Sequence, residues 1–222
     1  MITFEKVNLT YPNGSIALNT IDLTIRKGEL VIITGPSGSG KTSLLKLMMG
    51  MEKPTQGTVK LEGQAFKQNE DQLSKARRQI GPIFQDLRLI KGKTALENVI
   101  LGMRFYGYTE TYMKDTATKA LQEVGLGDKI ERRVENLSWG ETQRVAIARA
   151  VARKPSYIIA DEPTGSLDEA NAISILNLLA RFRNEETAVI ITTHATHLID
   201  AFNEATMIAI DQGTLKRQSP NV

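Results

Sequence analysis

The sequence contains no cysteine and no long apolar run, and each absence excludes a class of protein. Without cysteine, neither a disulfide framework nor a cysteine-rich metal site can form, which is compatible with a reducing compartment. A membrane-spanning helix needs about 18 consecutive apolar residues, and no such run is present. The first residues, Met1-Ile-Thr-Phe-Glu-Lys-Val, are typical of a strand and not of a secretory leader. We therefore expect a soluble protein that reaches a membrane only through a partner.

The chain also has little net charge and few aromatic residues. Its formal net charge is +3 over 222 residues, of which 41% are hydrophobic and 24% charged. This balance does not by itself indicate a nucleic-acid partner. The length is sufficient to bury a core, either in one large domain or in one domain with an inserted subdomain.

One glycine-rich stretch, Gly35-Pro-Ser-Gly-Ser-Gly-Lys41-Thr42, directly follows an apolar run at residues 30–33. It fits the pattern G-x-x-x-x-G-K-[ST], in which successive backbone N–H groups form a nest for phosphate oxygens. The helix that begins near Thr42 adds the partial positive charge of its N-terminus. In this pattern Lys41 reaches the β- and γ-phosphates of a nucleotide, and the Thr42 hydroxyl ligates Mg²⁺. The alternative, a Gly/Ser-rich surface turn, is disfavoured by the strand before the loop and the helix after it.

Two acidic residues, Asp161 and Glu162, follow the apolar run at residues 157–160. Open α/β sheets place their ligands at this carboxyl edge of the strands. Asp161 is the candidate metal-binding carboxylate and Glu162 the candidate general base. An acidic pair alone is often only a helix cap or a solvated turn, and the upstream phosphate loop favours the catalytic interpretation.

Both histidines follow the next apolar run, at residues 189–193. The topology could bring His194 to the same edge as the acidic pair, although a histidine at a strand end is often only a satisfied structural group. His197 lacks that context and is expected at the surface.

Ser138 and Gly140 open a helical run that continues through Arg149. The serine hydroxyl and the backbone N–H groups there predict a second anion-binding helix start. Because one nucleotide needs only one glycine-rich cradle, we interpret the second as serving the nucleotide of another subunit.

The remaining pattern predicts an α/β protein with an antiparallel part and a helical insertion. Alternating residues favour two antiparallel strands between residues 2 and 25. Further strands are expected at residues 30–34, 57–61, 80–85, 157–160 and 188–193, with a final short pair around Met207 and Leu215. Helices are expected at residues 42–49, 70–79, 170–183 and near 198–201, and the residues after Arg217 are expected to form a frayed tail. Residues 86 to about 154 are read as the helical insertion.

Taken in order, these features resemble the ATPase subunit of ABC transporters over nearly the whole chain. Residues 35–42 are similar to the Walker A loop and residues 157–162 to the Walker B strand with its catalytic glutamate. The Leu137-Ser-Trp-Gly-Glu141 segment is similar to the LSGGQ signature. It departs from that pattern at Trp139, where a glycine is usual, and at Thr142, where a glutamine is common. We expect Trp139 either to alter a dimer interface or nucleotide affinity, or to pack against the helical insertion.

The resemblance implies a P-loop NTPase core with an antiparallel β subdomain and an inserted α-helical subdomain. Residues 1–222 would form one domain, with residues 1–85 and 155–222 as the core and 86–154 as the helical subdomain carrying the signature. The implied catalytic residues are Glu162, His194 and Lys41, and the implied metal ligands are Thr42, Gln85 and Asp161. The implied ATP contacts are Tyr11, Gly35, Pro36, Ser37, Gly38, Ser39, Gly40, Lys41, Thr42, Ser43, Gln85, Ser138, Gly140 and Asp168.

The resemblance also implies partners. Two copies would meet head to tail and clamp ATP and Mg²⁺ between the phosphate loop of one and the signature helix of the other. Residues 76–90 and 93–99 are most similar to cell-division members of the family, with lipoprotein-releasing and macrolide-export ATPases as close alternatives. The expected place is the cytoplasmic face of the cell membrane, bound to an integral membrane partner.

Two other classes remain open. Nucleic-acid- or ribosome-associated members of the family usually carry two cassettes in one chain or long coiled-coil insertions, and this chain has neither, so no nucleic acid is expected. A regulatory module that binds nucleotide without hydrolysis is disfavoured by Glu162 and His194.

Overall fold

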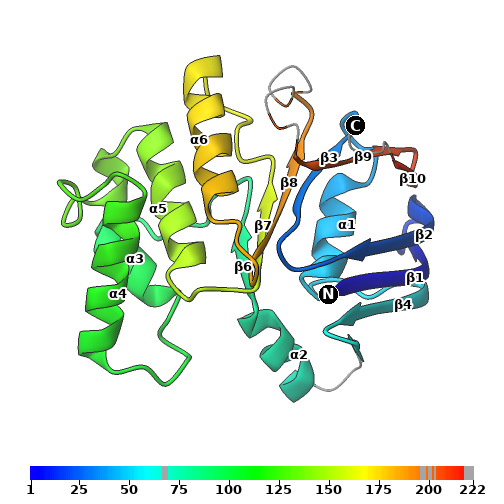
Figure 1. Ribbon diagram of the computed structural model, residues 1–222, viewed down its shortest axis with the longest axis horizontal. Coiled ribbons are helices and arrows are strands. Elements are labelled where there is room, and N and C mark those ends of the chain that lie inside the picture. The colour runs from blue at the N-terminus through cyan, green and yellow to red at the C-terminus, as the bar shows by residue number, and fades with distance from the viewer. Residues whose placement is uncertain (67–69, 196–198, 200–201, 203, 218–222) are drawn as a thin grey trace.

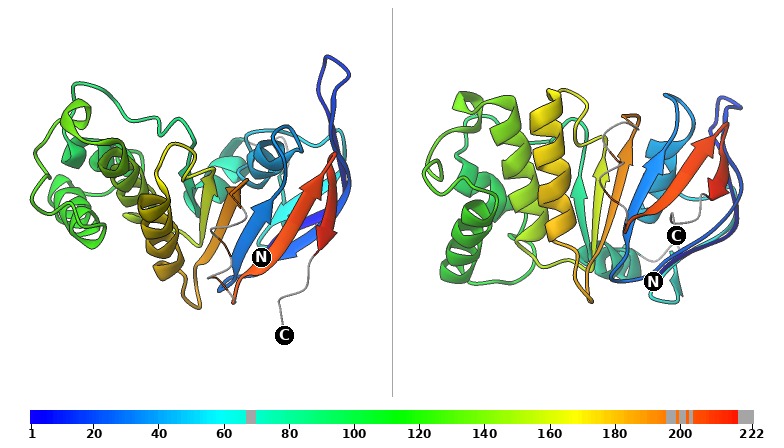
Figure 2. Two further views of the ribbon diagram at one scale, coloured as in Figure 1. Left: turned by 90° about the horizontal axis from the view of Figure 1, so that it is seen from above. Right: turned by 45° about the horizontal axis from the view of Figure 1, so that its top comes forward.

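The computed structural model describes residues 1–66, 70–195, 199, 202 and 204–217 and arranges them in layers (Figure 1). One layer is a four-stranded sheet in the order β2-β1-β4-β5, and another is a six-stranded sheet in the order β10-β9-β3-β8-β7-β6. Helices α3 to α6 gather on the side of the larger sheet away from the smaller one (Figure 2). The strands are β1 (Ile2–Thr10), β2 (Ile16–Ile25), β3 (Leu30–Thr34), β4 (Gln56–Leu61), β5 (Gln64–Ala65), β6 (Ile80–Ile83), β7 (Tyr157–Asp161), β8 (Ala188–Thr193), β9 (Thr206–Asp211) and β10 (Thr214–Arg217). The helices are α1 (Lys41–Met48), α2 (Glu70–Arg78), α3 (Ala95–Leu101), α4 (Glu110–Glu123), α5 (Trp139–Val151), α6 (Glu169–Arg181) and the short 3₁₀ helix η1 (Val134–Asn136).

The larger sheet is parallel except for β10, which pairs antiparallel with β9. Thr34 of β3 pairs with Thr193 of β8, and Asp161 of β7 pairs with Thr192. The carboxyl ends of the three strands therefore lie at one edge, which is where parallel sheets place their ligands.

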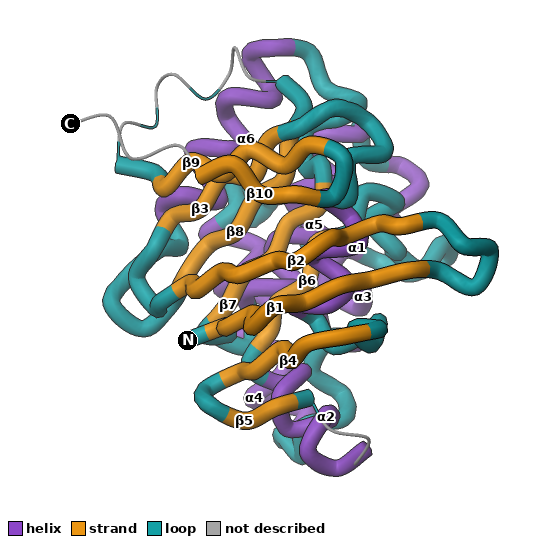
Figure 3. Tube along the Cα trace, turned by 90° about the vertical axis from the view of Figure 1, so that its right-hand side faces the viewer, coloured by secondary structure: helices purple, strands orange, loops and turns teal. Residues whose placement is uncertain are grey.

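The smaller sheet is antiparallel, as the alternating residues between 2 and 25 predicted. Ile2 of β1 pairs with Ile25 of β2 on one side and with Leu61 of β4 on the other. Figure 3, which faces this sheet, shows β10 beside β2, so the edge strands of the two sheets adjoin.

Alternate side chains of the parallel strands enter two different cores. On β3, Val31 and Ile33 pack in one core with Leu44 of α1 and the apolar face of the small sheet. Leu30 and Ile32 point the other way, into the core formed by α3 to α6. Burial on both faces explains why these strands are continuous apolar runs instead of alternating ones.

The fold class predicted from the sequence is confirmed, and most predicted elements lie within a few residues of the observed ones. Strand β5 and helix η1 were not predicted. The helix expected near residues 198–201 and the tail after Arg217 fall outside the described residues. Helices α3, α4 and α5 lie between residues 86 and 154, and the exact subdomain limits remain a prediction. Within the described ranges, no helix combines the length and the apolar character needed to cross a membrane.

Candidate active site

The loop between β3 and α1 is held in place by two glycines. A Cβ on Gly35 would lie 2.2 Å from the backbone oxygen of Ile210, and one on Gly40 would lie 2.5 Å from that of Ala17. Gly40 also has a φ of 109°, which side chains rarely adopt. The loop therefore packs directly on the backbones of β9 and β2, and only glycine fits at these two positions.

Lys41 lies inside the curve of this loop and is only 6% exposed. Its Nζ donates hydrogen bonds to the backbone oxygens of Gly35, at 2.8 Å, and Pro36, at 3.0 Å. The same Nζ lies 3.3 Å from Oε1 of Glu162. A buried ammonium group binds an anionic ligand strongly when the oxygens of the ligand replace the protein oxygens around it.

The other predicted loop residues differ in exposure. Pro36, Ser37 and Gly38 are exposed, as is Thr42 in the first turn of α1. Ser39 is buried, and its hydroxyl has no hydrogen-bond partner among the residues described. Ser43 is half-buried, and its hydroxyl lies 3.0 Å from that of Tyr11. The structure thus ties the Tyr11 ring, predicted to contact adenine, to the first turn of α1.

Asp161 ends β7 and is 7% exposed. The Thr192 hydroxyl donates to Asp161 Oδ1 at 2.8 Å and accepts the backbone N–H of Glu162 at 2.9 Å. Thr192 therefore holds both acids in place and was missed by the sequence prediction. The available signal was two consecutive threonines, Thr192 and Thr193, at the end of an otherwise apolar strand, both fully buried.

The Glu162 carboxylate lies between two basic side chains. Besides the contact to Lys41, its Oε2 lies 2.7 Å from His194 Nδ1. The Glu162 side chain is 11% exposed, whereas that of His194 is 61% exposed. The sequence prediction that His194 reaches the edge holding the acidic pair is therefore matched by a direct contact. His197 lies outside the described residues.

Gln85 follows β6, whose Ile83 pairs with Ala160 of β7. This pairing places Gln85 beyond the same edge of the sheet as Asp161. Gln85 is exposed. Its side chain forms no hydrogen bond with any described residue.

The predicted second anion site lies at the start of α5. Ser138 caps this helix: its hydroxyl accepts the Glu141 N–H at 3.3 Å, and its own N–H donates to the Glu141 carboxylate at 2.8 Å. Lys129 also binds this carboxylate. The hydrogen bonds from Lys129 and from the Ser138 backbone hold the pKa of Glu141 below its usual value.

A cavity of about 420 Å³ opens at this helix start and is lined by residues including Ser138, Gly140 and Asp168. Asp168 caps α6 by accepting the Asn171 N–H at 2.9 Å. The lining contains no residue from 35–43, so the phosphate loop and the start of α5 are two separate sites within one chain. Trp139 also lines this cavity and is 47% exposed. About half of the Trp139 surface is therefore open, and both alternatives for its role remain predictions.

Comparison with known proteins gives the family. Residues 18–165 match the ABC transporter family. The cell division ATP-binding protein FtsE of Bacillus subtilis is 36% identical over 98% of this chain and 95% of its own length. The lipoprotein-releasing system ATP-binding protein LolD of Aquifex aeolicus is 43% identical over 84% of each chain. A solved dimeric ATP-binding cassette in a post-hydrolysis state, bound to ADP and Pi, superposes with a TM-score of 0.88 at 33% identity and covers both chains completely. The chain therefore belongs to the ABC transporter family and is an ABC ATPase that is FtsE-like over nearly its whole length.

Proposed function

We propose that this chain is the ATP-hydrolysing subunit of a membrane complex of the cell-division FtsE/FtsX type. The observation that supports it most directly is the position of the Glu162 carboxylate, just after β7. It lies between Lys41, at the end of the phosphate loop, and His194, just after β8. This arrangement combines a cradle for a triphosphate with a general base beside it. ATP binding would close a dimer, and cleavage of the γ-phosphate would reopen it.

In this proposal each residue has a separate task. Lys41 leaves the backbone oxygens of its own loop and neutralises the β- and γ-phosphates of ATP. Glu162 accepts the proton of the attacking water, and His194 holds the carboxylate in orientation through the Nδ1 contact. Catalysis would rest on positioning and electrostatics, with no covalent intermediate on the protein.

The residues fit a nucleotide-bound Mg²⁺. The described part of the chain contains no cluster of three or more His, Cys, Asp or Glu side chains that could hold a metal alone. Asp161, Thr42 and Gln85 offer one carboxylate, one hydroxyl and one amide oxygen, and Mg²⁺ typically takes one or two protein oxygens together with phosphates and water. Bound there, the ion would neutralise charge that develops on the phosphates.

The separate cavity at the start of α5 supports a head-to-tail homodimer. Ser138, Gly140 and Asp168 would complete the ATP site of a second copy. Trp139 is the only tryptophan of the chain, and it lines this cavity. ATP added to a Glu162→Gln variant should therefore change tryptophan fluorescence and double the mass in size-exclusion chromatography. A purely monomeric protein at saturating ATP would overturn the homodimer.

A groove separate from the cavity at the start of α5 is consistent with a membrane partner. It is lined by residues including Met49, Met51, Phe84 and Tyr106, with the Arg77 and Arg153 guanidinium groups among them. Phe84 directly precedes Gln85, the proposed metal ligand. A segment bound in this groove would therefore contact the neighbour of a residue in the ATP site. We propose that it receives a cytoplasmic segment of the partner that carries apolar and acidic side chains.

The experiment for the membrane role is co-purification from solubilised membranes. The wild-type chain should retain a membrane protein of FtsX type, and Met51→Glu should lose it without losing basal ATP hydrolysis. Met51 is 41% exposed, and Ile16→Glu, on an exposed residue of β2, is the matched control. Vigorous hydrolysis with no membrane partner, or salt-sensitive binding to DNA or RNA, would contradict the proposal.

The similarity to LolD favours a second candidate, an ATPase subunit of a lipoprotein-releasing type of complex. A macrolide-export type is a further alternative of the same mechanism. The identity of the retained membrane protein decides among them. In the cell-division case, depletion of the chain should block septation and change peptidoglycan hydrolysis, whereas in the lipoprotein case it should mislocalise lipoproteins.

A further inference from the structure

Gln85 depends on its neighbours for its position. Its side chain is exposed and forms no hydrogen bond with any residue in the described ranges. On its N-terminal side the backbone is fixed by the pairing of Ile83 with Ala160. On its C-terminal side the chain leaves the sheet, so the turn after Gln85 must supply the remaining constraint.

That turn has an unusual backbone. Leu87 and Arg88 have φ angles of 54° and 49°, in the left-handed region that residues with side chains seldom adopt. Leu87 N donates to Phe84 O at 3.0 Å, and Arg88 N donates to Asp86 O at 2.6 Å. Such strained backbone persists only where its surroundings hold it, and it clusters at functional sites.

The group that holds the turn is Arg149 of α5. Its Nη1 donates to the backbone oxygen of Arg88 at 2.6 Å, and its Nη2 donates to that of Leu87 at 2.5 Å. The planar guanidinium group matches two neighbouring acceptors, which an ammonium group cannot do in the same geometry. Burial lowers the pKa of Arg149, and the neighbouring Arg88 lowers it further, although a guanidinium stays protonated.

The surrounding helices make room for this side chain. Gly102 stands at the C-terminal end of α3, and a Cβ there would lie 2.8 Å from Arg149 Cγ. The Arg149 side chain is therefore confined between α3 and the turn. Because α5 begins after Ser138, one rigid helix connects the predicted second phosphate site to the turn that follows Gln85.

We propose that Arg149 is a positioning residue for Gln85. Its guanidinium group holds the turn at residues 86–88, so that the amide oxygen of Gln85 stays where a nucleotide-bound Mg²⁺ can be reached. This inference rests on the proposed role of Gln85 as a metal ligand. It adds a residue that does not touch nucleotide or metal and acts only through the backbone.

The first test uses the nucleotide-free protein, so that it does not depend on catalysis. Arg149→Lys keeps the charge and loses the planar pair of donors. Hydrogen exchange at the Leu87 and Arg88 amides should become faster by roughly ten-fold, as expected when hydrogen bonds from a charged donor to this turn are lost. Unchanged exchange at these two amides would overturn the proposal.

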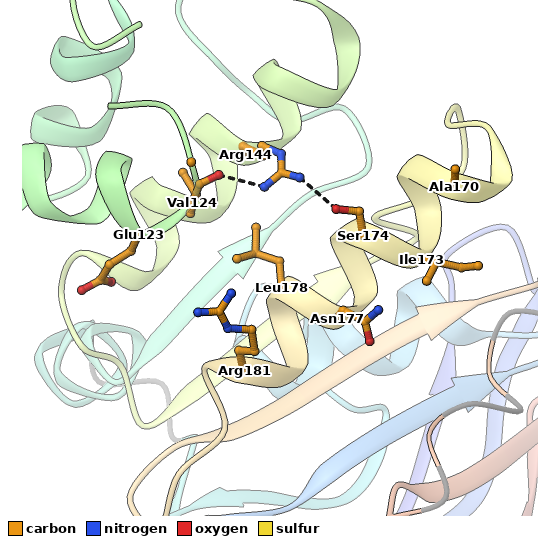
Figure 4. Close-up of a pocket in the computed structure, with 10 residues that line it drawn as sticks. Glu123, Val124, Arg144, Ala170, Ile173, Ser174, Asn177, Leu178 and Arg181 are labelled. Atoms are coloured by element: carbon orange, nitrogen blue, oxygen red, sulfur yellow. Dashed lines mark hydrogen bonds between the residues drawn. The ribbon is translucent and has the colours of Figure 1, made fainter. Parts of the chain in front are cut away.

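The matched control is Arg144→Lys on the same helix. Arg144 Nη1 donates to Val124 O at 2.8 Å, and its Nη2 donates to Ser174 Oγ at 2.9 Å. It therefore also makes two hydrogen bonds, beside the cavity drawn in Figure 4. This variant should lower thermal stability by an amount similar to Arg149→Lys. It should leave exchange at residues 87 and 88 unchanged, and faster exchange there would mean a general loosening of α5 and would count against the proposal.

The second test measures the Mg²⁺ concentration for half-maximal ATP hydrolysis. It should rise roughly 10- to 100-fold in Arg149→Lys, the range seen when a residue supporting a metal ligand is changed. In a Gln85→Ala background the same substitution should cause no further rise, whereas multiplied effects would overturn action through Gln85. If Gln85→Ala alone leaves the Mg²⁺ dependence unchanged, the metal role of Gln85 falls, and hydrogen exchange still decides whether Arg149 holds the turn.

Discussion

His194 Nδ1 lies 2.7 Å from Glu162 Oε2, although His194 stands in the segment after a different strand, 32 residues along the chain. With the proton on Nδ1, the ring donates to the carboxylate and leaves Nε2 free to accept or to exchange a proton. The other carboxylate oxygen lies 3.3 Å from Lys41 Nζ. Glu162 is thus held from both sides, and this geometry leads to the first prediction.

Replacing Glu162 by glutamine should abolish most hydrolysis and preserve nucleotide binding. The amide keeps the size of the side chain and one acceptor oxygen but cannot take the proton of the attacking water, and a general base contributes roughly 10²- to 10⁴-fold. Steady-state phosphate release and equilibrium ATP binding measure the two effects. Glu186→Gln, at an exposed carboxylate paired with Lys27, is the control and should leave both unchanged. Turnover within a few-fold of wild type would remove Glu162 from the mechanism.

Thr192→Val should weaken both stability and metal dependence. Valine keeps the shape, but Asp161 loses a donor and the Glu162 N–H loses its acceptor, which costs about 1–3 kcal/mol in the free energy of unfolding. Urea unfolding and a Mg²⁺ titration of ATP hydrolysis measure the two effects.

Thr187→Val is the matched variant for Thr192, because Thr187 is also buried and donates to the Pro155 oxygen at 3.0 Å, before the start of β8. It should lower stability to a similar degree without changing the Mg²⁺ dependence. Equal Mg²⁺ curves for the two variants would mean that Thr192 has only a structural role.

Gly35→Ala should disrupt the phosphate loop. The added Cβ would lie 2.2 Å from the Ile210 backbone oxygen, so the loop must move, at a cost of about 1–3 kcal/mol for an overpacked contact. We expect a lower unfolding temperature and loss of ATP binding, measured by thermal unfolding and by titration with a fluorescent ATP analogue. Gly14→Ala is the control, since Gly14 also has a positive φ of 84° but no atom within 4 Å of the new Cβ. Normal ATP binding by Gly35→Ala would contradict the close packing of this loop.

The Lys129–Glu141 pair should contribute to the free energy of unfolding only at pH values where Glu141 is ionised. The folded pKa of Glu141 lies below its ordinary value of 4.5, so its contribution is complete above that pH and is lost as the pH falls through the folded pKa. Lys129→Met should cost at most about 1 kcal/mol near neutral pH, because the pair is partly exposed.

The difference between wild type and Lys129→Met in urea unfolding should disappear as the pH falls well below 4.5. Lys114→Met, on an exposed lysine of α4, should show little difference at any pH. A Lys129 effect that grew toward low pH would contradict the sign of this pKa shift.

The predicted site consists of two parts with different origins. Residues 35–42 could be located from the sequence because one contiguous segment creates both the backbone nest and the start of its helix. The positions of Asp161 and His194 followed from apolar runs that end in polar residues, since parallel strands share an edge. Thr192 was missed although two threonines end an apolar strand, and Arg149 was missed because an arginine in a helix carries no signal of its own. Their importance lies in partners that are distant along the chain.

The sequence by itself determined what depends on neighbouring residues: the phosphate loop, the strands that alternate or stay apolar, the capped start of α5 and the family. Only the tertiary structure decided which of these segments meet. It joined Lys41, Glu162 and His194 at one carboxylate, placed Ser138 in a separate cavity and set the Arg149 guanidinium on the turn after Gln85. The physical reason is that such contacts depend on strand order and helix packing, which the whole core sets together.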